Sequence, residues 1–291
     1  MGCAIVKDYR ENEVLRHSFN KLAMKTFGID FESWYQNGFW TERYNPYSIL
    51  LDGEIIANVS VNRMKMCMAE KEYNFIQLGT VMTYEEHRNK GYIRMLMEKI
   101  DNDFEGQVDG FFLFGNDSVL NFYPQFGFEP AQEFQLIKEK VYNSEHTFSA
   151  KNIPMETKEN WNFLVQKMKE SVPNGRLEMV DNTQLAMFYL SGFMKDNVYY
   201  VEEEDAYVVA EIDGKELLLT AVYADHVVTL EKVIAAFGNG IERVKLGFTP
   251  LNKNEFDEIS FREEDCTLFL KGDVWQEYRK EHMRFPKLSH A

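Results

Sequence analysis

Apolar residues recur with helical spacing near the start of the chain and with strand spacing soon after. Positions 14, 15, 19, 22, 23 and 27 are apolar, and Gly28 follows, so the sequence predicts a helix over 11–27. A short helical region rich in aromatic residues is expected over 31–45. Two strands, 47–51 and 54–66, flank Asp52-Gly53, which is a strong hairpin turn.

Strand and helix patterns then alternate up to residue 141. We expect strands at 73–83, 111–114 and 134–141, a helix from about 92 to 104, and a short helix carrying Tyr123. Strands that alternate with helices bury one face of each helix on a sheet. The pattern therefore predicts an α/β fold, with a mixed sheet and helices on both faces.

The second half of the chain repeats this order in outline. Residues 143–158 are polar and contain Pro154, so we place a boundary there, between a domain at 1–145 and another at 155–291. The expected helices are 158–170, 182–194 and 229–237, and the expected strands are 198–202, 206–212, 216–223 and 243–248.

The turn between the strand at 73–83 and the helix from 92 has a composition suited to phosphate. Arg88 and Lys90 bring positive charge, and Gly91 lets backbone approach an anion closely. The first N–H groups of a helix have no internal acceptor and lie at its positive end. The turn therefore predicts a site for a ligand that bears a pyrophosphate.

Two stretches of this half resemble the signatures of the GNAT N-acetyltransferases. Arg88-Asn89-Lys90-Gly91-Tyr92-Ile93 is similar to the acetyl-CoA motif Arg/Gln-x-x-Gly-x-Gly/Ala, with Ile93 in place of the last small residue. Asn116 after a strand, Tyr123 seven residues on, and then Gly127-Phe128 resemble the second signature. The wording is closest to the Eis-like branch, in which a larger aliphatic residue commonly takes the place of Ile93.

The resemblance implies a role for each matching residue in binding acetyl-CoA as a cosubstrate. The backbone from Arg88 to Ile93 would hold the pyrophosphate. Val81 and Thr83 would pair with pantetheine amides, and the backbone around Met82 could polarise the thioester carbonyl. Asn116 would reach the pantetheine or nearby backbone. Tyr123 would give a proton to the departing thiolate, because a phenol has a reference pKa of about 10.

The base that takes the proton of the amine stays open. Many GNATs place a Glu eleven residues before the Arg/Gln of the motif, and this chain has Gln77 there, which can orient water but cannot accept a proton. Glu32, Glu42, an ordered water chain or the carboxylate of Ala291 are the alternatives. Among the aromatic residues at 31–45, Trp40 is the expected wall of the acceptor pocket.

The second half is expected to be a degenerate copy that does not hold CoA. Between Tyr223 and Thr229 the chain reads Ala-Asp-His-Val-Val, without a basic glycine turn. Eis-like proteins also carry a degenerate second GNAT half, and usually continue into a third domain for which this chain is too short. Two-domain members commonly associate, so self-association of this chain is also an expectation.

Composition narrows the partners and the compartment. A net charge of −15 argues against nucleic acid and could steer a cationic amine toward the protein, although solubility also explains it. The three cysteines and six histidines show no metal-ligand spacing, and unpaired cysteines favour the cytoplasm. We find no membrane span and no signal peptide.

The leading hypothesis is an acetyl-CoA-dependent N-acetyltransferase that acts on a primary amine, of a small molecule or of a protein. A non-catalytic acyl-CoA-binding sensor is the main alternative, favoured by Gln77. A third hypothesis, an aminoacyl- or peptidyl-transferase on the same scaffold, would need charged tRNA, which the acidic balance disfavours.

Overall fold

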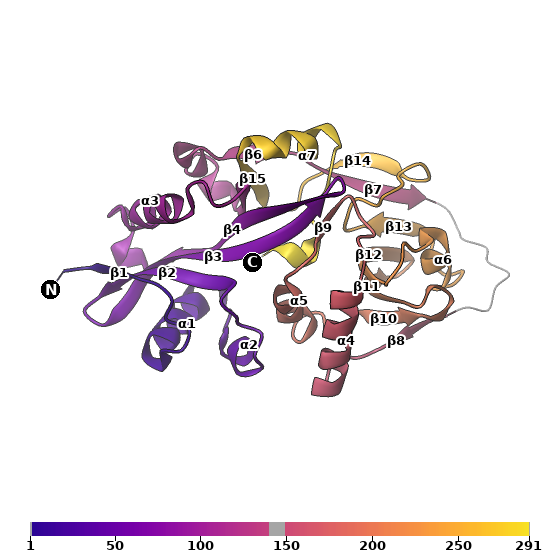
Figure 1. The fold of residues 1–291 in the computed structure, drawn as a ribbon, viewed down its shortest axis with the longest axis horizontal. Helices are drawn as coiled ribbons and strands as arrows, with labels where there is room; N and C mark the ends of the chain where they lie inside the picture. The colour runs from indigo at the N-terminus through magenta and orange to yellow at the C-terminus, as the bar shows by residue number, and fades with distance from the viewer. Residues whose placement is uncertain (1, 140–148, 291) are drawn as a thin grey trace.

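The computed structural model describes residues 2–139 and 149–290, which form two sheets lying end to end (Figure 1). The first sheet, in spatial order, consists of β1 (Ala4–Val6), β2 (Tyr44–Leu51), β3 (Glu54–Met68), β4 (Lys71–Thr83), β5 (Gly110–Gly115), β15 (Thr267–Lys271) and β6 (Glu129–Ala131), with β9 (Leu177–Met179) paired to β3. The second consists of β14 (Asp257–Phe261), β7 (Glu133–Glu139), β13 (Arg243–Leu246), β12 (Glu216–Tyr223), β11 (Ala206–Asp213), β10 (Val198–Val201) and β8 (Ala150–Asn152).

Helices cover both faces of the first sheet, as expected. The helices of the chain are α1 (Glu13–Phe27), α2 (Glu32–Gln36), α3 (Tyr92–Phe104), α4 (Lys158–Glu170), α5 (Thr183–Leu190), α6 (Leu230–Ala235) and α7 (Gln276–Lys280). On β2, Tyr47 bonds to Asp103 of α3, whereas the ring of Tyr44 stacks on Phe31 beside α2. Residues three apart on a strand point to opposite faces, so α3 and α2 lie on opposite sides of the sheet.

Local signals explain where α1 begins and ends. The side chain of Asn12 accepts a hydrogen bond from the N–H of Leu15, and Gly28, with φ +70°, closes the last turn by donating to Met24. Phe19 and Leu22 are fully buried against the sheet. Removing a side chain of this kind costs about 2–5 kcal/mol of stability. The predicted helix is thus confirmed, apart from its first two residues.

The two sheets exchange strands, which the sequence did not indicate. β7 leaves the first half and lies between β13 and β14 of the second sheet. In return, β15 from near the C-terminus pairs antiparallel with both β5 and β6. The division at 145–155 remains a prediction for the folding units. The strand expected over 134–141 in the first half is β7, which spans 133–139 and belongs to the second sheet.

The expected repeat of the first half is visible in the strand pairing. β4 runs parallel to β5 and β12 runs parallel to β13, with a helix, α3 or α6, in each crossover. The predicted strand at 216–223 is confirmed residue for residue, and α5 ends at Leu190 rather than near 194. Residues 140 and 141 of the expected strand 134–141 lie outside the described residues.

Candidate active site

The site begins where β4 and β5 separate. Their parallel pairing runs from Phe75↔Gly110 to Leu78↔Leu113, yet β4 continues to Thr83. At Thr80 the backbone takes a φ of +49°, and the register between β3 and β4 shifts there. A positive φ is strained for a β-branched residue and costs on the order of 1–3 kcal/mol.

Two hydrogen bonds hold this bulge. The hydroxyls of Tyr44 and Thr80 lie 2.6 Å apart, and the amide of Asn58 donates to the carbonyl of Thr80 over 2.9 Å. A bulge bends its strand and interrupts the ladder. The end of β4 therefore leaves β5, and its backbone groups are free to pair with a ligand in the gap.

A cavity of about 900 Å³ occupies this gap and continues beyond both strands. All ten residues that the sequence selected for coenzyme binding line it: Val81, Met82, Thr83, Arg88, Asn89, Lys90, Gly91, Tyr92, Ile93 and Asn116. Tyr123 lines it as well. The fold therefore brings together residues from β4, the turn before α3, the end of β5 and the short helix that follows.

The turn before α3 presents an open helix start to the cavity. Asn89 and Gly91 have φ of +60° and +79°, and α3 begins without a side-chain cap. Nothing lies within 4 Å of a Cβ built on Gly91, so its backbone conformation, rather than crowding, favours glycine. The first N–H groups of α3 are thus left for a ligand, and the exposed side chains of Arg88 and Lys90 stand beside them.

The end of β5 places Tyr123 over the gap. The ring of Tyr123 packs on Phe269 of β15, at 5.3 Å between centroids, and is 4% exposed. A Cβ on Gly115 would lie 2.8 Å from this ring, so glycine is needed there for the close approach. Burial raises the pKa of Tyr123 to about 12, which keeps the phenol protonated at neutral pH.

Asn116 follows β5 in an exposed turn that the C-terminal part of the chain supports. Its side-chain oxygen accepts a hydrogen bond from Ser118 over 2.6 Å, which leaves its amide nitrogen free to donate. The next residue, Asp117, is held by Arg262 at 2.7 Å and by a bond from its own N–H to Asp265. Residues about 145 positions away in sequence therefore fix this edge of the cavity.

The structure places Trp40 and Gln77 away from the cavity wall. Trp40 is 2% exposed and donates its indole N–H to the carbonyl of Tyr44. Phe31, Trp34 and Tyr44 line the cavity in its stead. Gln77 is fully buried between neighbouring strands, and neither atom of its amide has a partner among the described residues. The aromatic wall was thus expected in the right region but at the wrong tryptophan.

The carboxylates considered as bases do not line the cavity either. Glu32 receives two hydrogen bonds from Arg16, which hold the pKa of this carboxyl below its usual range. Glu42 is exposed, with Arg10 3.7 Å away. A carboxylate with a lowered pKa is a weaker base, so Glu32 is poorly suited to accept a proton from an ammonium. Ala291 lies outside the described residues.

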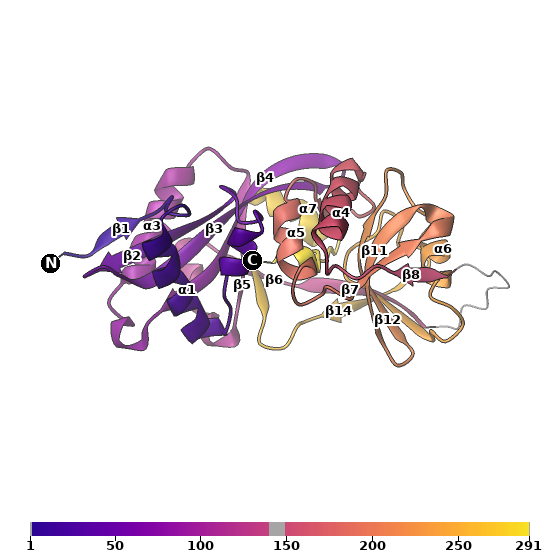
Figure 2. The ribbon, with the colours of Figure 1, turned by 90° about the horizontal axis from the view of Figure 1, so that it is seen from below.

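Sequence reasoning missed the contribution of α5 to this cavity. Leu185, Phe188 and Tyr189 line it from the second half, and the indole N–H of Trp34 donates to the carbonyl of Gln184 over 2.9 Å. α5 lies between the two sheets (Figure 2). A signal was present, since the helix is apolar on all sides from Leu185 to Leu190, which is typical of a helix buried between two bodies.

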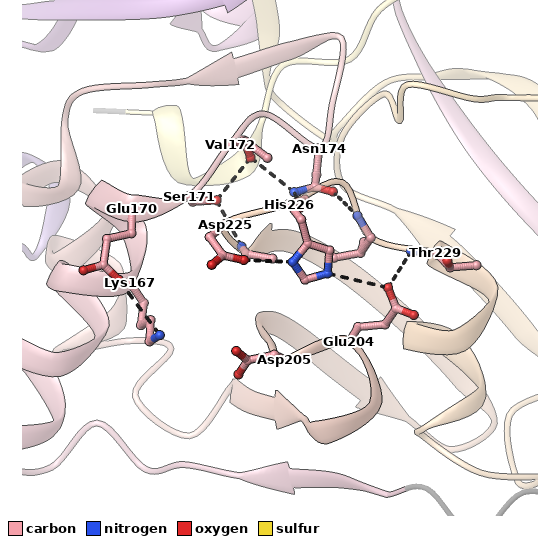
Figure 3. Close-up of polar contacts among 12 residues, drawn as sticks. Lys167, Glu170, Ser171, Val172, Asn174, Glu204, Asp205, Asp225, His226 and Thr229 are labelled. Atoms are coloured by element: carbon pink, nitrogen blue, oxygen red, sulfur yellow. Dashed lines mark hydrogen bonds and ion pairs between the residues drawn. The ribbon is translucent and has the colours of Figure 1, made fainter.

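The second half closes the position that corresponds to the open turn. Between β12 and α6, the side chain of Asn174 accepts a hydrogen bond from Val228 and donates to the carbonyl of His226. The carboxylate of Glu204 accepts a hydrogen bond from the N–H of Thr229 over 2.8 Å, at the start of α6, as Figure 3 shows. An internal carboxylate therefore takes the place that a phosphate would need.

The gap between β12 and β13 is almost filled as well. Their parallel pairing ends at Leu219↔Leu246, and the register against β11 shifts by one residue at Thr220, as it does at Thr80 in β4. The cavity at this point holds only about 50 Å³, because β9, α5 and residues 286–289 pack into it. The same backbone plan thus produces an open gap in one half and a filled one in the other.

Across residues 2–139 and 149–290, no three His, Cys, Asp or Glu side chains gather in a way that could hold a metal ion. In this same part of the chain, no helix is long and apolar enough to cross a membrane.

Comparison with known proteins shows a likeness over the first half. Residues 10–131 match the model of a protein family described as an acetyltransferase (GNAT) domain. This match covers the open turn and Tyr123. The first half is therefore similar to a GNAT acetyltransferase domain. No curated protein matches the sequence.

Solved structures extend the likeness in fold to most of the chain. A probable N-acyltransferase from Enterococcus faecalis has a TM-score of 0.63 at 14% identity, covering 96% of this chain and 74% of its own. A GCN5-related N-acetyltransferase from Kribbella flavida has a TM-score of 0.57 at 11% identity, covering 92% of this chain and 70% of its own. Eis1 from Mycobacterium abscessus has 0.57 at 12%, covering 92% and 72%. At such low sequence identity, these structural matches show a shared fold alone, which extends over both halves of the chain.

Proposed function

We propose that the protein transfers the acetyl group of acetyl-CoA directly to a primary amine. One observation carries the proposal: an uncapped helix start, a gap between two parallel strands and a protonated tyrosine meet in a single cavity of about 900 Å³. Each feature meets one need of the reaction. The helix start would anchor the pyrophosphate, the gap would hold the pantetheine extended, and the tyrosine would protonate the leaving sulfur.

The residues present fit acetyl-CoA in order along the cavity. The N–H groups from Arg88 to Ile93 would take the pyrophosphate, with the positive end of α3 behind them. Val81 and Thr83, beyond the bulge of β4, would pair with the pantetheine as an added strand does. The backbone at Met82 would stabilise charge on the carbonyl oxygen, and losing one such donor costs on the order of 10²–10³ in rate.

The proton balance of the transfer follows from Tyr123. The amine nitrogen forms a bond to the carbonyl carbon, the C–S bond breaks, and the sulfur leaves as a thiolate that takes the phenol proton of Tyr123. The amine loses one proton, which returns to Tyr123 through water. Burial raises the pKa of Tyr123 to about 12, above that of an ordinary thiol, so proton transfer to the thiolate alone is unfavourable. The acidic amine proton that returns to Tyr123 through water completes the transfer. Among the described residues that line the cavity there is no cysteine, which supports direct transfer.

The state of the cysteines supports a cytoplasmic location. The three cysteines are unpaired, with Cys3 exposed and Cys67 buried. We place the protein in the cytoplasm, where thiols stay reduced.

Calorimetry with acetyl-CoA tests the proposal. Gly91→Glu puts a negative charge at the expected pyrophosphate position, and we expect affinity to fall by at least about 100-fold. Gly238→Glu is the matched control, because Gly238 also has a positive φ, of +87°, and open space around it, but lies in the second half. Equal binding by wild type and the Gly91 variant, or no binding by wild type, would contradict the proposal.

A non-catalytic acyl-CoA sensor is the second candidate. It is favoured by the lack of any Asp or Glu among the described residues that line the cavity, which leaves no side-chain carboxylate to take the amine proton. Release of free CoA in the presence of amines distinguishes the two. Tight binding of acetyl-CoA without amine-dependent release, for any amine tested, would support the sensor.

A further inference from the structure

The two ends of the cavity differ in chemistry. The end at the start of α3 carries the basic side chains His87, Arg88, Lys90 and Arg94. The opposite end, between α2 and α5, is lined by Phe31, Trp34, Tyr44, Leu185 and Phe188. No described residue that lines either end is acidic. A polycation would therefore meet positive charge at one end and find no carboxylate at the other.

Aromatic rings give the acceptor end a defined shape. The ring of Phe31 stacks on Tyr44 at 5.6 Å and on Phe188 at 5.4 Å, with interplanar angles of 20° and 18°. Trp34 meets Tyr44 and Phe188 edge-on, and its indole N–H is fixed by the bond to Gln184. Because neighbouring rings hold one another in place, this end has a rigid apolar wall, which favours an apolar guest.

Two carboxylates in the segments that form this end are already engaged. Glu32 is bound by Arg16, and Asp181 lies 2.5 Å from Arg43. An ion pair of this kind presents little net charge to a passing ligand. Recognition at the acceptor end therefore rests on apolar contact rather than on charge.

The rim of the cavity is apolar where it meets solvent. Phe27 lines the cavity while 48% exposed, and Phe193, which is 70% exposed, packs on Phe188 at 5.7 Å. Isolated exposed apolar residues are common, but Phe27 lines the cavity and Phe193 contacts a ring that lines it. They would be covered by a ligand whose apolar body enters there.

We propose, on the basis of the function proposed above, that the acceptor is an arylalkyl primary amine with a single amino group. The aromatic end would hold the ring and direct the amine past Thr80, whose hydroxyl contacts Tyr44, toward the thioester carbonyl at Met82. Apolar surroundings disfavour an ammonium ion and lower its pKa. The pocket thus helps the amine to arrive neutral, which lessens the need for a side-chain carboxylate, and the described residues of the lining include none.

The transfer is tested with tryptamine and phenethylamine against spermidine and kanamycin, at saturating acetyl-CoA. We expect kcat/KM for the arylalkyl amines to exceed that for the polycations by at least about tenfold, the range that one apolar contact provides. Phe188→Ala should raise KM for tryptamine about tenfold or more, with unchanged affinity for acetyl-CoA. Phe163→Ala, on exposed α4 outside the cavity, is the matched control.

Each result has one meaning. Equal or faster turnover of spermidine or kanamycin overturns the inference, as does tight acetyl-CoA binding with no turnover of arylalkyl amines. A Phe188→Ala variant that binds acetyl-CoA normally and keeps its KM for tryptamine also overturns it. Failure of wild type to bind acetyl-CoA is a separate result, which overturns the proposed function itself.

Discussion

The turn before α3 and the loop before α6 occupy equivalent places in the two halves, yet one is open and the other is satisfied from within. In the first, the helix start has no cap and faces a cavity of about 900 Å³. In the second, Glu204 and Asn174 take the N–H groups of Thr229 and Val228, and the gap behind holds about 50 Å³. The first N–H groups of a helix need a hydrogen-bond acceptor from outside the helix. Where the protein supplies this acceptor, the helix start is capped, and where it does not, a ligand can bind.

This difference also explains why the second half has no need of a basic glycine turn. Glu204 supplies the negative charge at the start of α6, and Lys232 balances it from 3.2 Å (Figure 3 shows the loop). A phosphate there would meet a buried carboxylate and be repelled. The second half instead provides α5, which lines the acceptor end of the first.

The largest effect should come from Tyr123→Phe. Losing the proton donor should lower kcat about 10²–10³-fold while acetyl-CoA affinity stays unchanged, measured by free CoA release and calorimetry. Because burial raises the pKa of Tyr123 to about 12, the phenol stays protonated below that pH, so Tyr123 should cause no fall in rate between pH 7 and 10. Tyr207→Phe in the second half is the control, and an equal loss of rate there would contradict the assignment.

Hydrogen exchange should separate the two loops directly. At 100 times its Kd, acetyl-CoA should raise the free energy of opening at amides 91–94 by up to about 2.7 kcal/mol. Amides 225–230 should show no change beyond that of the whole chain. Protection confined to amides 225–230 would mean that acetyl-CoA binds in the second half, which would contradict the proposed site.

Asn174→Ala should destabilise the protein without affecting the ligand. It leaves the buried N–H of Val228 without an acceptor, which should lower the free energy of unfolding by about 1–3 kcal/mol in denaturant titrations. Acetyl-CoA affinity should be unchanged. If instead Asn174→Ala weakened acetyl-CoA binding tenfold at normal stability, the second loop would take part in binding.

The smallest effect should follow from removing the exposed charges. Arg88→Gln with Lys90→Gln should weaken acetyl-CoA binding about 3- to 10-fold and make it less sensitive to salt, since exposed charges are well screened. Stability should change little. Lys158→Gln with Lys169→Gln on α4 makes the same charge change away from the cavity, and it should leave the affinity as it is.

Local patterns were enough to select residues that line one cavity in the first half. The start of α3, Gly91, Asn116 and Tyr123 all lie within about 40 residues, so turn chemistry and spacing indicated them. The hairpin over Asp52-Gly53 and the strand at 216–223 were predicted for the same reason. The sequence also indicated, through the missing basic turn, that the second half differs.

Only the tertiary structure decided which residues surround the acceptor and how the halves join. The exchange of β7 and β15 depends on contacts between residues more than 100 positions apart, and so does the position of α5. Local periodicity in the sequence cannot predict such contacts. Trp34 and Trp40 are the same residue type and lie in the same aromatic-rich stretch of the sequence, 31–45. Both are buried, but Trp34 on α2 bonds to Gln184 of α5 and lines the cavity. By contrast, Trp40 lies after α2 and bonds to the carbonyl of Tyr44. Contacts between segments distant in sequence decide this difference.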